Sequence, residues 1–196
     1  MREGWSYKKL GEVCDVLNGL WTGKKEPFIK VAVIRNTNFT KDCKLNLSDV
    51  AYLDVEQKQF SSRKLQVGDI IIEKSGGSEK QPVGRPVLFN ISEGNYSFSN
   101  FTSTLRLHDS NILPTFLHLC LYGHYRRGET LKMQAKTTGL HNLDMKAYLR
   151  LEIPYLPLST QQQIVEELDL LSGIIEKQKA QLKELKFPTS VIEGCS

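Results

Sequence analysis

The sequence predicts an α+β fold, in which a mixed-sheet globular domain is followed by a long C-terminal helix of the coiled-coil type. Two observations predict it. Up to residue 159, short runs of β-branched and aromatic residues are bounded by Gly, Asn, Pro or Ser, which is typical of strands joined by turns. From residue 160, apolar residues recur at steps of three and four, which is typical of an amphipathic helix. We expect a domain at 1–157, a helix at 158–187 and a tail at 188–196.

Four segments of the globular part carry strand signals: PFIKVAVIRN at 27–36, GDIIIEK at 68–74, GRPVLFN at 84–90 and FTSTLRL at 101–107. One helix is predicted among them, LPTFLHLCLYGHY at 113–125. Its proline stands where a first helical turn tolerates one, and its apolar residues form a broad face. Strands and a helix in one domain indicate the mixed α+β class.

The C-terminal helix is expected to begin at Thr160, which forms a capping box with Gln163. A heptad seam with one polar member, Gln178, follows. Its apolar members are Ile164, Leu168, Leu171, Ile175, Leu182 and Leu185. The alternative is a surface helix that lies on its own domain, because three and a half heptads is short for a coiled coil.

Composition excludes several classes of protein. The chain has 196 residues and 40% hydrophobic residues, enough for a sizeable core, so a disordered tail protein is excluded. It has no long apolar run and no signal-peptide core at its N-terminus, which favours a cytoplasmic protein without a membrane span. The four cysteines form no CxxC pair, which argues against a zinc knuckle or a disulfide framework.

The positive charge is concentrated in the globular part. Residues 1–159 carry a net charge of +6, whereas residues 160–196 carry −2. A basic surplus of this kind suits a phosphate-binding surface, although its size is modest.

No pattern of catalytic residues stands out. The glycine-rich turn and the Asn/Asp-Pro-Pro-aromatic pocket of an adenine methyltransferase are absent from the sequence. Glu73 and Lys74 are adjacent, so in a strand they point to opposite faces, unlike the residues of a metal-dependent nuclease. His118 and His124 are six residues apart and do not share a helical face. An enzyme with a remotely assembled site, and a protein–protein interaction module acting through the C-terminal helix, remain as alternatives.

Two passages carry a family resemblance. The first runs GDIIIEKSGGSEKQPVGRPVLFN through YSFSNFTSTLRL, and the second is KTTGLHNLDMKAYLRLEIPYLPLSTQQQIVEELDLL. Together with the opening WSYKKLGEV, they resemble type I restriction-modification specificity subunits. Two positions depart from the family pattern: Leu156 replaces the first proline of a pair, and Thr160 stands in place of the usual glutamate.

The resemblance implies a DNA-recognition module without catalysis of its own. A full subunit of this family has two target-recognition domains and two spacer helices, whereas this chain has one of each and no internal repeat. A natural half-subunit and a truncated cassette both remain open. Methylation and cleavage are expected in partner methyltransferase and restriction subunits that use S-adenosylmethionine, ATP and Mg²⁺, and this chain is expected to need no cofactor. Without a second helix, we expect a homodimer.

The predicted DNA-binding residues are donors and glycines in or beside turns, where long side chains can reach a groove. They are Lys24, Lys25, Arg35, Asn36, Lys74, Ser75, Gly76, Gly77, Lys80, Arg85, Lys136 and Thr138. The glycines are expected to allow close backbone approach to a phosphate. The alternative for the loop at 74–80 is an ordinary flexible hairpin tip.

Overall fold

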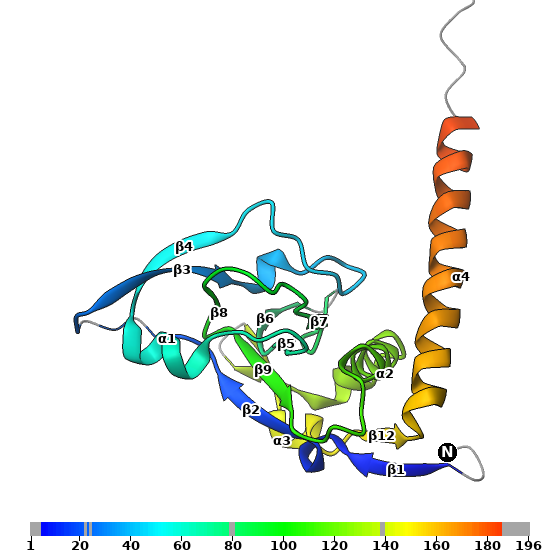
Figure 1. The fold of residues 1–196 in the computed structure, drawn as a ribbon, viewed down its shortest axis with the longest axis horizontal. Coiled ribbons are helices and arrows are strands. Elements are labelled where there is room, and N and C mark those ends of the chain that lie inside the picture. Colours follow the sequence, from blue (N-terminus) through cyan, green and yellow to red (C-terminus); the bar gives the residue numbers. More distant parts are fainter. Residues whose placement is uncertain (1–4, 22, 24, 79–80, 138–139, 186–196) are drawn as a thin grey trace, which may run out of the picture.

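A computed structural model describes residues 5–21, 23, 25–78, 81–137 and 140–185, except that the side chains at 136–137 and 184–185 are not described. It consists of a globular body from which one long helix projects (Figure 1). Both parts of the predicted α+β fold are confirmed, the mixed sheets and the C-terminal helix.

The centre of the body is an antiparallel sheet in the order β2-β9-β5-β7. Its strands are Cys14–Asn18, Thr102–Leu107, Ile70–Glu73 and Pro86–Leu88. Strand β5 is fully buried because both of its faces are covered. Ile70 and Ile72 pack into one core cluster with α2 (Pro114–Arg126), and Ile71 packs into another with Phe98.

A second sheet has the order β4-β3-β8 and is mixed, because β3 pairs antiparallel with β4 and parallel with β8. These strands are Ala51–Glu56, Phe28–Ile34 and Tyr96–Phe98. Helix α1 (Gln57–Arg63) follows β4 directly and buries Phe60 among Val31, Val33 and Val55.

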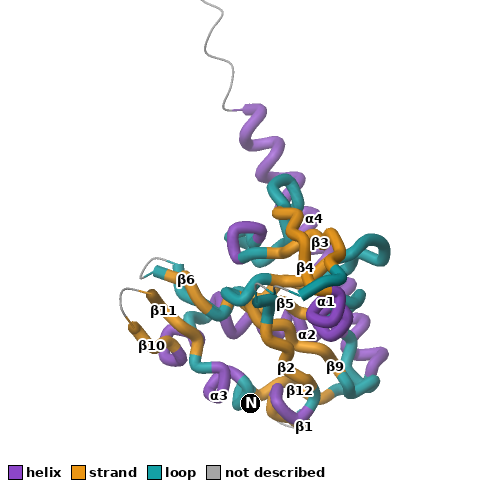
Figure 2. Tube along the Cα trace, turned by 90° about the vertical axis from the view of Figure 1, so that its left-hand side faces the viewer, coloured by secondary structure: helices purple, strands orange, loops and turns teal. Residues whose placement is uncertain are grey.

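A third sheet projects from the side of the body, in the order β10-β11-β6 (Figure 2). It consists of Gln134–Thr137, Leu140–Leu143 and Ser75–Gly77. A two-stranded sheet of β1 (Ser6–Lys9) and β12 (Glu152–Tyr155) closes the base of the body. The short helices are η1 (Leu10–Glu12), η2 (Asn36–Asn38), η3 (Glu129–Met133) and α3 (Met145–Tyr148).

The long helix α4 spans Leu158–Leu185, about 42 Å at 1.5 Å per residue. Because it begins at Leu158, Thr160 lies inside the first turn and the predicted capping box does not start the helix. Gln161 fixes this turn to the body instead. Its side chain is fully buried, accepts a hydrogen bond from the Leu113 amide (2.9 Å) and donates to the carbonyls of Asn111 (2.7 Å) and Leu156 (2.8 Å).

The division into a domain at 1–157, a helix at 158–187 and a tail at 188–196 stays a prediction, and residues 186–196 lie outside the described part of the chain. No helix of the described residues is long and apolar enough to cross a membrane.

Candidate nucleic-acid interface

Five of the predicted DNA-binding residues meet where β3 and β5 end. We call Asn36, Lys74, Ser75, Gly76 and Gly77 the turn cluster. The Asn36 side-chain amide donates to the Ser75 carbonyl at 3.4 Å, which joins the turn after β3 to strand β6. The backbone amides of Lys74 and Ser75 both donate to the Phe101 carbonyl, at 2.9 and 3.0 Å. These bonds hold a polar surface between the second and third sheets.

The third sheet extends the turn cluster. Ser75 and Gly77 pair with β11, and β11 pairs with β10, so the backbone of Lys136 lies two strands from β6. The Ser75 hydroxyl also hydrogen-bonds Asn142 on β11. Two parts of the sequence, β6 and the neighbouring strands β10 and β11, therefore share one small sheet, an arrangement that can present hydrogen-bonding groups to a DNA groove.

The two glycines of the turn cluster are required by the fold itself. Gly76 has φ = +101°, and a Cβ there would lie 2.8 Å from the Asn36 amide nitrogen. A Cβ at Gly77 would lie 2.7 Å from a methyl carbon of Val83. From the sequence, we expected these glycines to let the backbone approach a DNA phosphate. Packing within the chain is sufficient to explain why both positions are glycine.

Lys74 is the charged residue of the turn cluster. Its side chain is partly buried, and the resulting desolvation lowers the pKa of its ammonium group. A partly desolvated ammonium ion gains more from a nearby anion than a fully hydrated one, because less of its hydration must be lost on binding. A phosphate oxygen is a suitable partner for it.

Arg85 does not belong to this surface, and its predicted role as a DNA-binding residue is contradicted by its burial. Its side chain is 5% exposed and forms a two-point ion pair with Glu73, at 2.7 and 3.0 Å. The same guanidinium donates to the carbonyls of Phe39 (3.0 Å) and Asn36 (3.3 Å). With its donors occupied inside the protein, Arg85 supports the turn that carries Asn36 and cannot reach a base.

Arg35 and Lys25 lie at opposite ends of β3. The Arg35 side chain is 38% exposed and has a loose contact with Asp49, whose own side chain is 90% exposed (3.5 Å). Its Nη2 also donates to the Asp49 carbonyl at 3.2 Å, so Asp49 holds the partly exposed Arg35 side chain beside Asn36 of the turn cluster. Lys25 precedes β3, whose seven residues span about 23 Å. The structure therefore does not bring Lys25 to the turn cluster.

Three predicted residues, Lys24, Lys80 and Thr138, lie outside the described residues, as does the side chain of Lys136. Their contact with DNA stays a prediction, as it does for the turn cluster. His141 and Asn142, which the sequence analysis did not select, lie in β11. The His141 ring contacts the Gln134 side chain at 3.3 Å. The polar pair between Leu140 and Leu143 was the only available signal.

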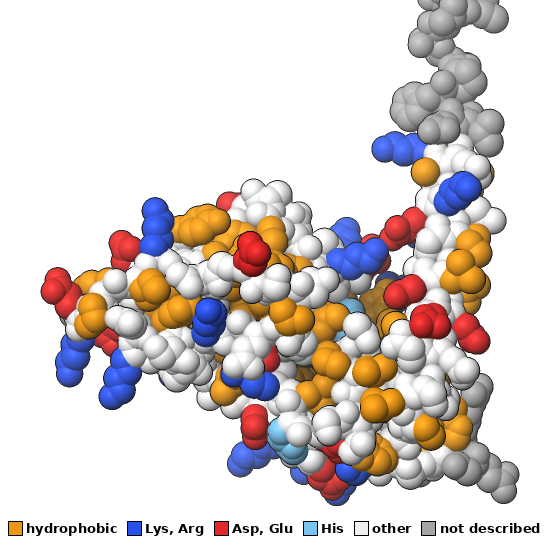
Figure 3. All heavy atoms as spheres, in the orientation of Figure 1, with side chains coloured by type: hydrophobic (Ala, Val, Ile, Leu, Met, Phe, Trp, Pro, Cys, Tyr) orange, Lys and Arg blue, Asp and Glu red, His pale blue; other side chains and the backbone are white. Residues whose placement is uncertain are grey.

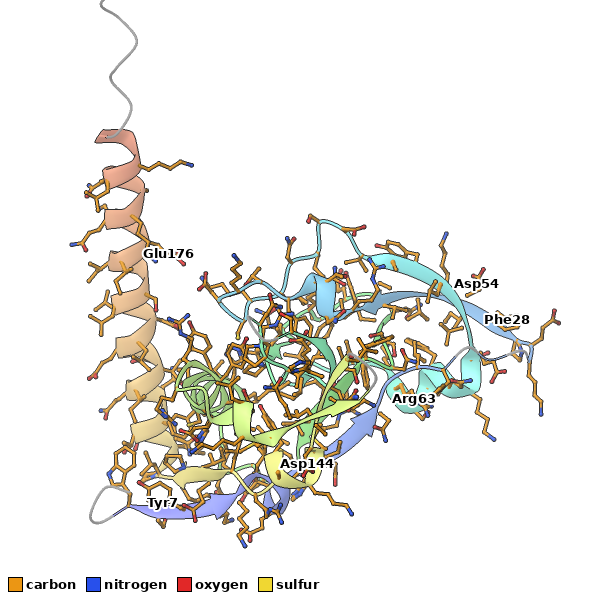
Figure 4. The ribbon with its side chains drawn as sticks, turned by 180° about the vertical axis from the view of Figure 1, so that it is seen from behind. Tyr7, Phe28, Asp54, Arg63, Asp144 and Glu176 are labelled. Carbon is orange, nitrogen blue, oxygen red and sulfur yellow. The ribbon has the colours of Figure 1, made fainter. Side chains whose placement is uncertain are left out.

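Helix α4 attaches to the body through its first turns and then extends away from it. Ile164 and Val165 pack against the core, and Glu176 (labelled in Figure 4) pairs with Lys44 at 2.8 Å, between two exposed side chains. Four predicted seam residues form what we call the apolar strip, with exposed fractions of 41% for Leu168, 54% for Leu171, 50% for Ile175 and 58% for Leu182. The Leu185 side chain lies outside the described residues.

Apolar side chains line the flank of α4 that is turned away from the body (Figure 3). Among the described residues, no group of three or more His, Cys, Asp or Glu side chains could hold a metal ion.

Comparison with known proteins gives a consistent result. The family model described as "Type I restriction modification DNA specificity domain" matches residues 2–186. The specificity subunit of the type I restriction enzyme EcoKI from Escherichia coli K12 is 26% identical over 205 aligned residues, which cover 98% of this chain and 42% of that subunit. The chain thus spans less than half of this curated relative.

Solved structures share the fold. A chain from a study of complex assembly in the type I R-M system matches with a TM-score of 0.65 and 21% identity, over 94% of this chain and 42% of that one. The HsdS subunit from Thermoanaerobacter tengcongensis matches with a TM-score of 0.58 and 22% identity, over 96% and 41%. The type I S subunit from M. genitalium matches with 0.57 and 16%, over 93% and 43%. At these identities the structural likeness establishes the fold alone.

Proposed function

Because this chain belongs to the family of type I restriction modification DNA specificity domains, we propose that it recognises a DNA sequence and directs partner subunits to it. The observation that carries the proposal is a single globular domain with a long helix fixed to it through buried Gln161. A helix held at a defined angle can set the distance between a bound DNA segment and a second module. The family match favours this function over a remotely assembled enzyme or a helix-only interaction module.

The DNA contact would lie on the turn cluster and the third sheet, with Arg35 beside them. Lysine side chains there would bind phosphates, and arginine and asparagine side chains would contact base edges in the major groove. The chain itself would bind DNA without catalysing a reaction and without a cofactor. It would act in the cytoplasm, with methyltransferase and restriction subunits that use S-adenosylmethionine, ATP and Mg²⁺.

The apolar strip on α4 would pair with the same helix of a second copy. Each aliphatic side chain that becomes fully buried contributes about 1.5–3 kcal/mol. The four residues of the apolar strip are half-exposed, so covering them with a second helix would add favourable free energy. An antiparallel helix pair would place two identical domains at opposite ends of a two-fold dimer. Such a dimer would recognise an inverted repeat separated by a gap that neither domain contacts.

Sedimentation of the free chain tests the dimer. We expect a dimer at tens of micromolar, and a monomer for the Leu171→Asp/Ile175→Asp double variant, because two buried carboxylates would oppose pairing. Gln163→Asp, on a different face of the same helix, is the matched control and should remain dimeric. A wild-type monomer, or a dimer that tolerates both aspartates, would contradict this part of the proposal.

Selection of bound duplexes from a random library tests recognition. The chain should enrich one sequence half-site or an inverted pair of them. Retention of all sequences alike at moderate salt would show that sequence recognition is absent.

A further inference from the structure

A second surface lies at the end of the body opposite α4 (Figure 1), where α1 and the residue before it contact Asn18, Trp21 and Lys25. The contacts come from Glu56, directly before α1, and from Gln59 and Arg63 on α1. These three residues are spaced three and four apart, so they lie on one side of the helix. The contacts are Arg63 Nε to the Asn18 carbonyl (3.1 Å), the Trp21 amide to Gln59 Oε1 (3.4 Å) and the Lys25 amide to Glu56 Oε1 (2.7 Å). Figure 4 shows Arg63 and Phe28 at this end, far from Glu176 on α4.

The opposite face of α1 is exposed and polar. Phe60 anchors the helix in the core, while Gln57, Lys58 and Ser61 are exposed. No carboxylate occurs anywhere from residue 57 to residue 68. The Ser61 hydroxyl donates to the Gln57 carbonyl at 2.8 Å and keeps its acceptor positions. Every polar group on this face is of a type that hydrogen-bonds phosphates or base edges.

Trp21 lies beside α1, and the residue is 64% exposed. Its backbone is held by Gln59, so the exposure belongs to an anchored position. Tryptophan is enriched among the residues that contribute most to binding at interfaces. The charge of α1 itself favours one partner: lysine is depleted at protein–protein interfaces, whereas the basic side chains of α1 suit DNA phosphates.

We propose that the outer face of α1, with the indole of Trp21, is a second contact surface for duplex DNA, separate from the turn cluster. Lys58 binds a phosphate, Gln57 and Ser61 face the groove, and Trp21 packs on a sugar or base edge. The proposal rests on the DNA-recognition function and assigns to it residues that the sequence analysis did not select.

The spacing of the two surfaces suits one duplex. They flank opposite ends of β3, about 23 Å apart along the strand. At 3.4 Å per base pair, this distance corresponds to about seven base pairs of B-form DNA. This separation along β3 is shorter than one helical turn of B-form DNA.

Affinity measurements on the full chain test the surface. A labelled 40-base-pair duplex of random sequence is titrated at about 0.1 M salt with the wild type, Lys58→Ala, Trp21→Ala and the control Lys179→Ala on α4. Loss of one phosphate contact should weaken binding about 5- to 10-fold. We expect this loss for Lys58→Ala, a comparable or larger loss for Trp21→Ala, and no change for Lys179→Ala.

A spectroscopic arm uses Trp21 directly. The chain has two tryptophans, so Trp5→Phe leaves Trp21 as the sole indole. Acrylamide should quench its emission efficiently in the free chain and much less once duplex is bound. Thermal melts of Lys58→Ala and Trp21→Ala should match the wild type, because both side chains are exposed.

The outcomes separate the two proposals. If the wild type binds duplex and both variants match Lys179→Ala, this surface is wrong and the recognition function stands. If Trp21→Ala weakens association with a methyltransferase subunit but not with DNA, the surface is a protein interface, which also overturns the inference. If the wild type binds no duplex, the proposed function itself fails.

Discussion

Replacing Arg85 distinguishes a structural ion pair from a DNA-reading arginine. The pair with Glu73 is enclosed, with side-chain exposures of 5% and 1%. Arg85→Met removes the cation and leaves the Glu73 carboxylate buried without its partner. We therefore expect a large loss of stability that is independent of DNA.

The magnitude follows from the burial. Removing one member of a buried ion pair costs about 3–5 kcal/mol, because the remaining charge is desolvated and uncompensated. For a chain of this size, each kcal/mol lowers the melting temperature by about 2–4 °C, so the expected drop is about 6–20 °C. The double variant Glu73→Leu/Arg85→Met removes both charges and should recover most of the loss. Recovery should be incomplete, since the Phe39 and Asn36 carbonyls also lose a donor.

The assay is a double-mutant cycle by urea denaturation, with Arg85→Met, Glu73→Leu, the double variant and the wild type. The reasoning would be refuted if Arg85→Met lost less than about 1 kcal/mol, or if the double variant were as unstable as the two single losses combined. A stable Arg85→Met chain with relaxed base preference would restore the original prediction that Arg85 contacts DNA.

Three further predictions concern the helix attachment, pH and DNA reading. Gln161→Leu should lower the free energy of unfolding, measured by urea denaturation, by about 2–3 kcal/mol, because the three hydrogen bonds of Gln161 contribute about 1 kcal/mol each. A decrease below about 0.5 kcal/mol would contradict its anchoring role. Hydrogen bonds from the Lys8 ammonium and the Asn111 backbone amide lower the pKa of Asp109 to about 2. The ionised Asp109 carboxylate therefore stabilises the fold above about pH 4, and this contribution is lost as the pH falls toward about 2. Lys8→Met should raise that pKa in an NMR titration, and an unchanged value would exclude the Lys8 contact in solution. Arg35→Ala should cost about 1–3 kcal/mol on the specific duplex and relax one position, whereas Lys80→Ala should weaken all duplexes and lower the salt slope by about one; equal losses from both would contradict the division.

Elements with strong local signals were predictable from the sequence. The helix expected at 113–125 is α2, Pro114–Arg126, because proline is tolerated at the first helical position and the apolar face continues through the segment. The strand signals at 68–74 and 101–107 contain β5 and β9, since β5 has three consecutive isoleucines and β9 alternates Thr102 and Thr104 with other residues. In each case the residues that define the element are adjacent in the sequence.

The third sheet was not predictable in this way. Strand β6 is Ser-Gly-Gly, which has low strand propensity and reads as a loop. It becomes a strand because β11, more than sixty residues later in the chain, supplies its hydrogen-bond partners. Pairing between distant segments leaves no local periodicity in either one.

Arg85 was misassigned for a related reason. Between Gly84 and Pro86 it reads as an exposed turn charge. The register of β5 and β7, in which Ile72 opposes Pro86, places Arg85 opposite Glu73. The sequence did contain one indication of this pairing. Glu73 ends the otherwise apolar strand β5, and a buried carboxylate requires a cation as its partner. Only the strand register identifies which cation that is.

Mapping methylated adenines in cells tests whether this chain directs methylation to one DNA sequence. Cells that contain a cognate methyltransferase subunit are compared with and without this chain, and with the Leu171→Asp/Ile175→Asp variant. We expect modification of one bipartite motif, an inverted repeat with a fixed gap, that appears only with the wild-type chain and is lost with the variant. Modification that does not depend on the chain, or a single uninterrupted motif, would contradict it.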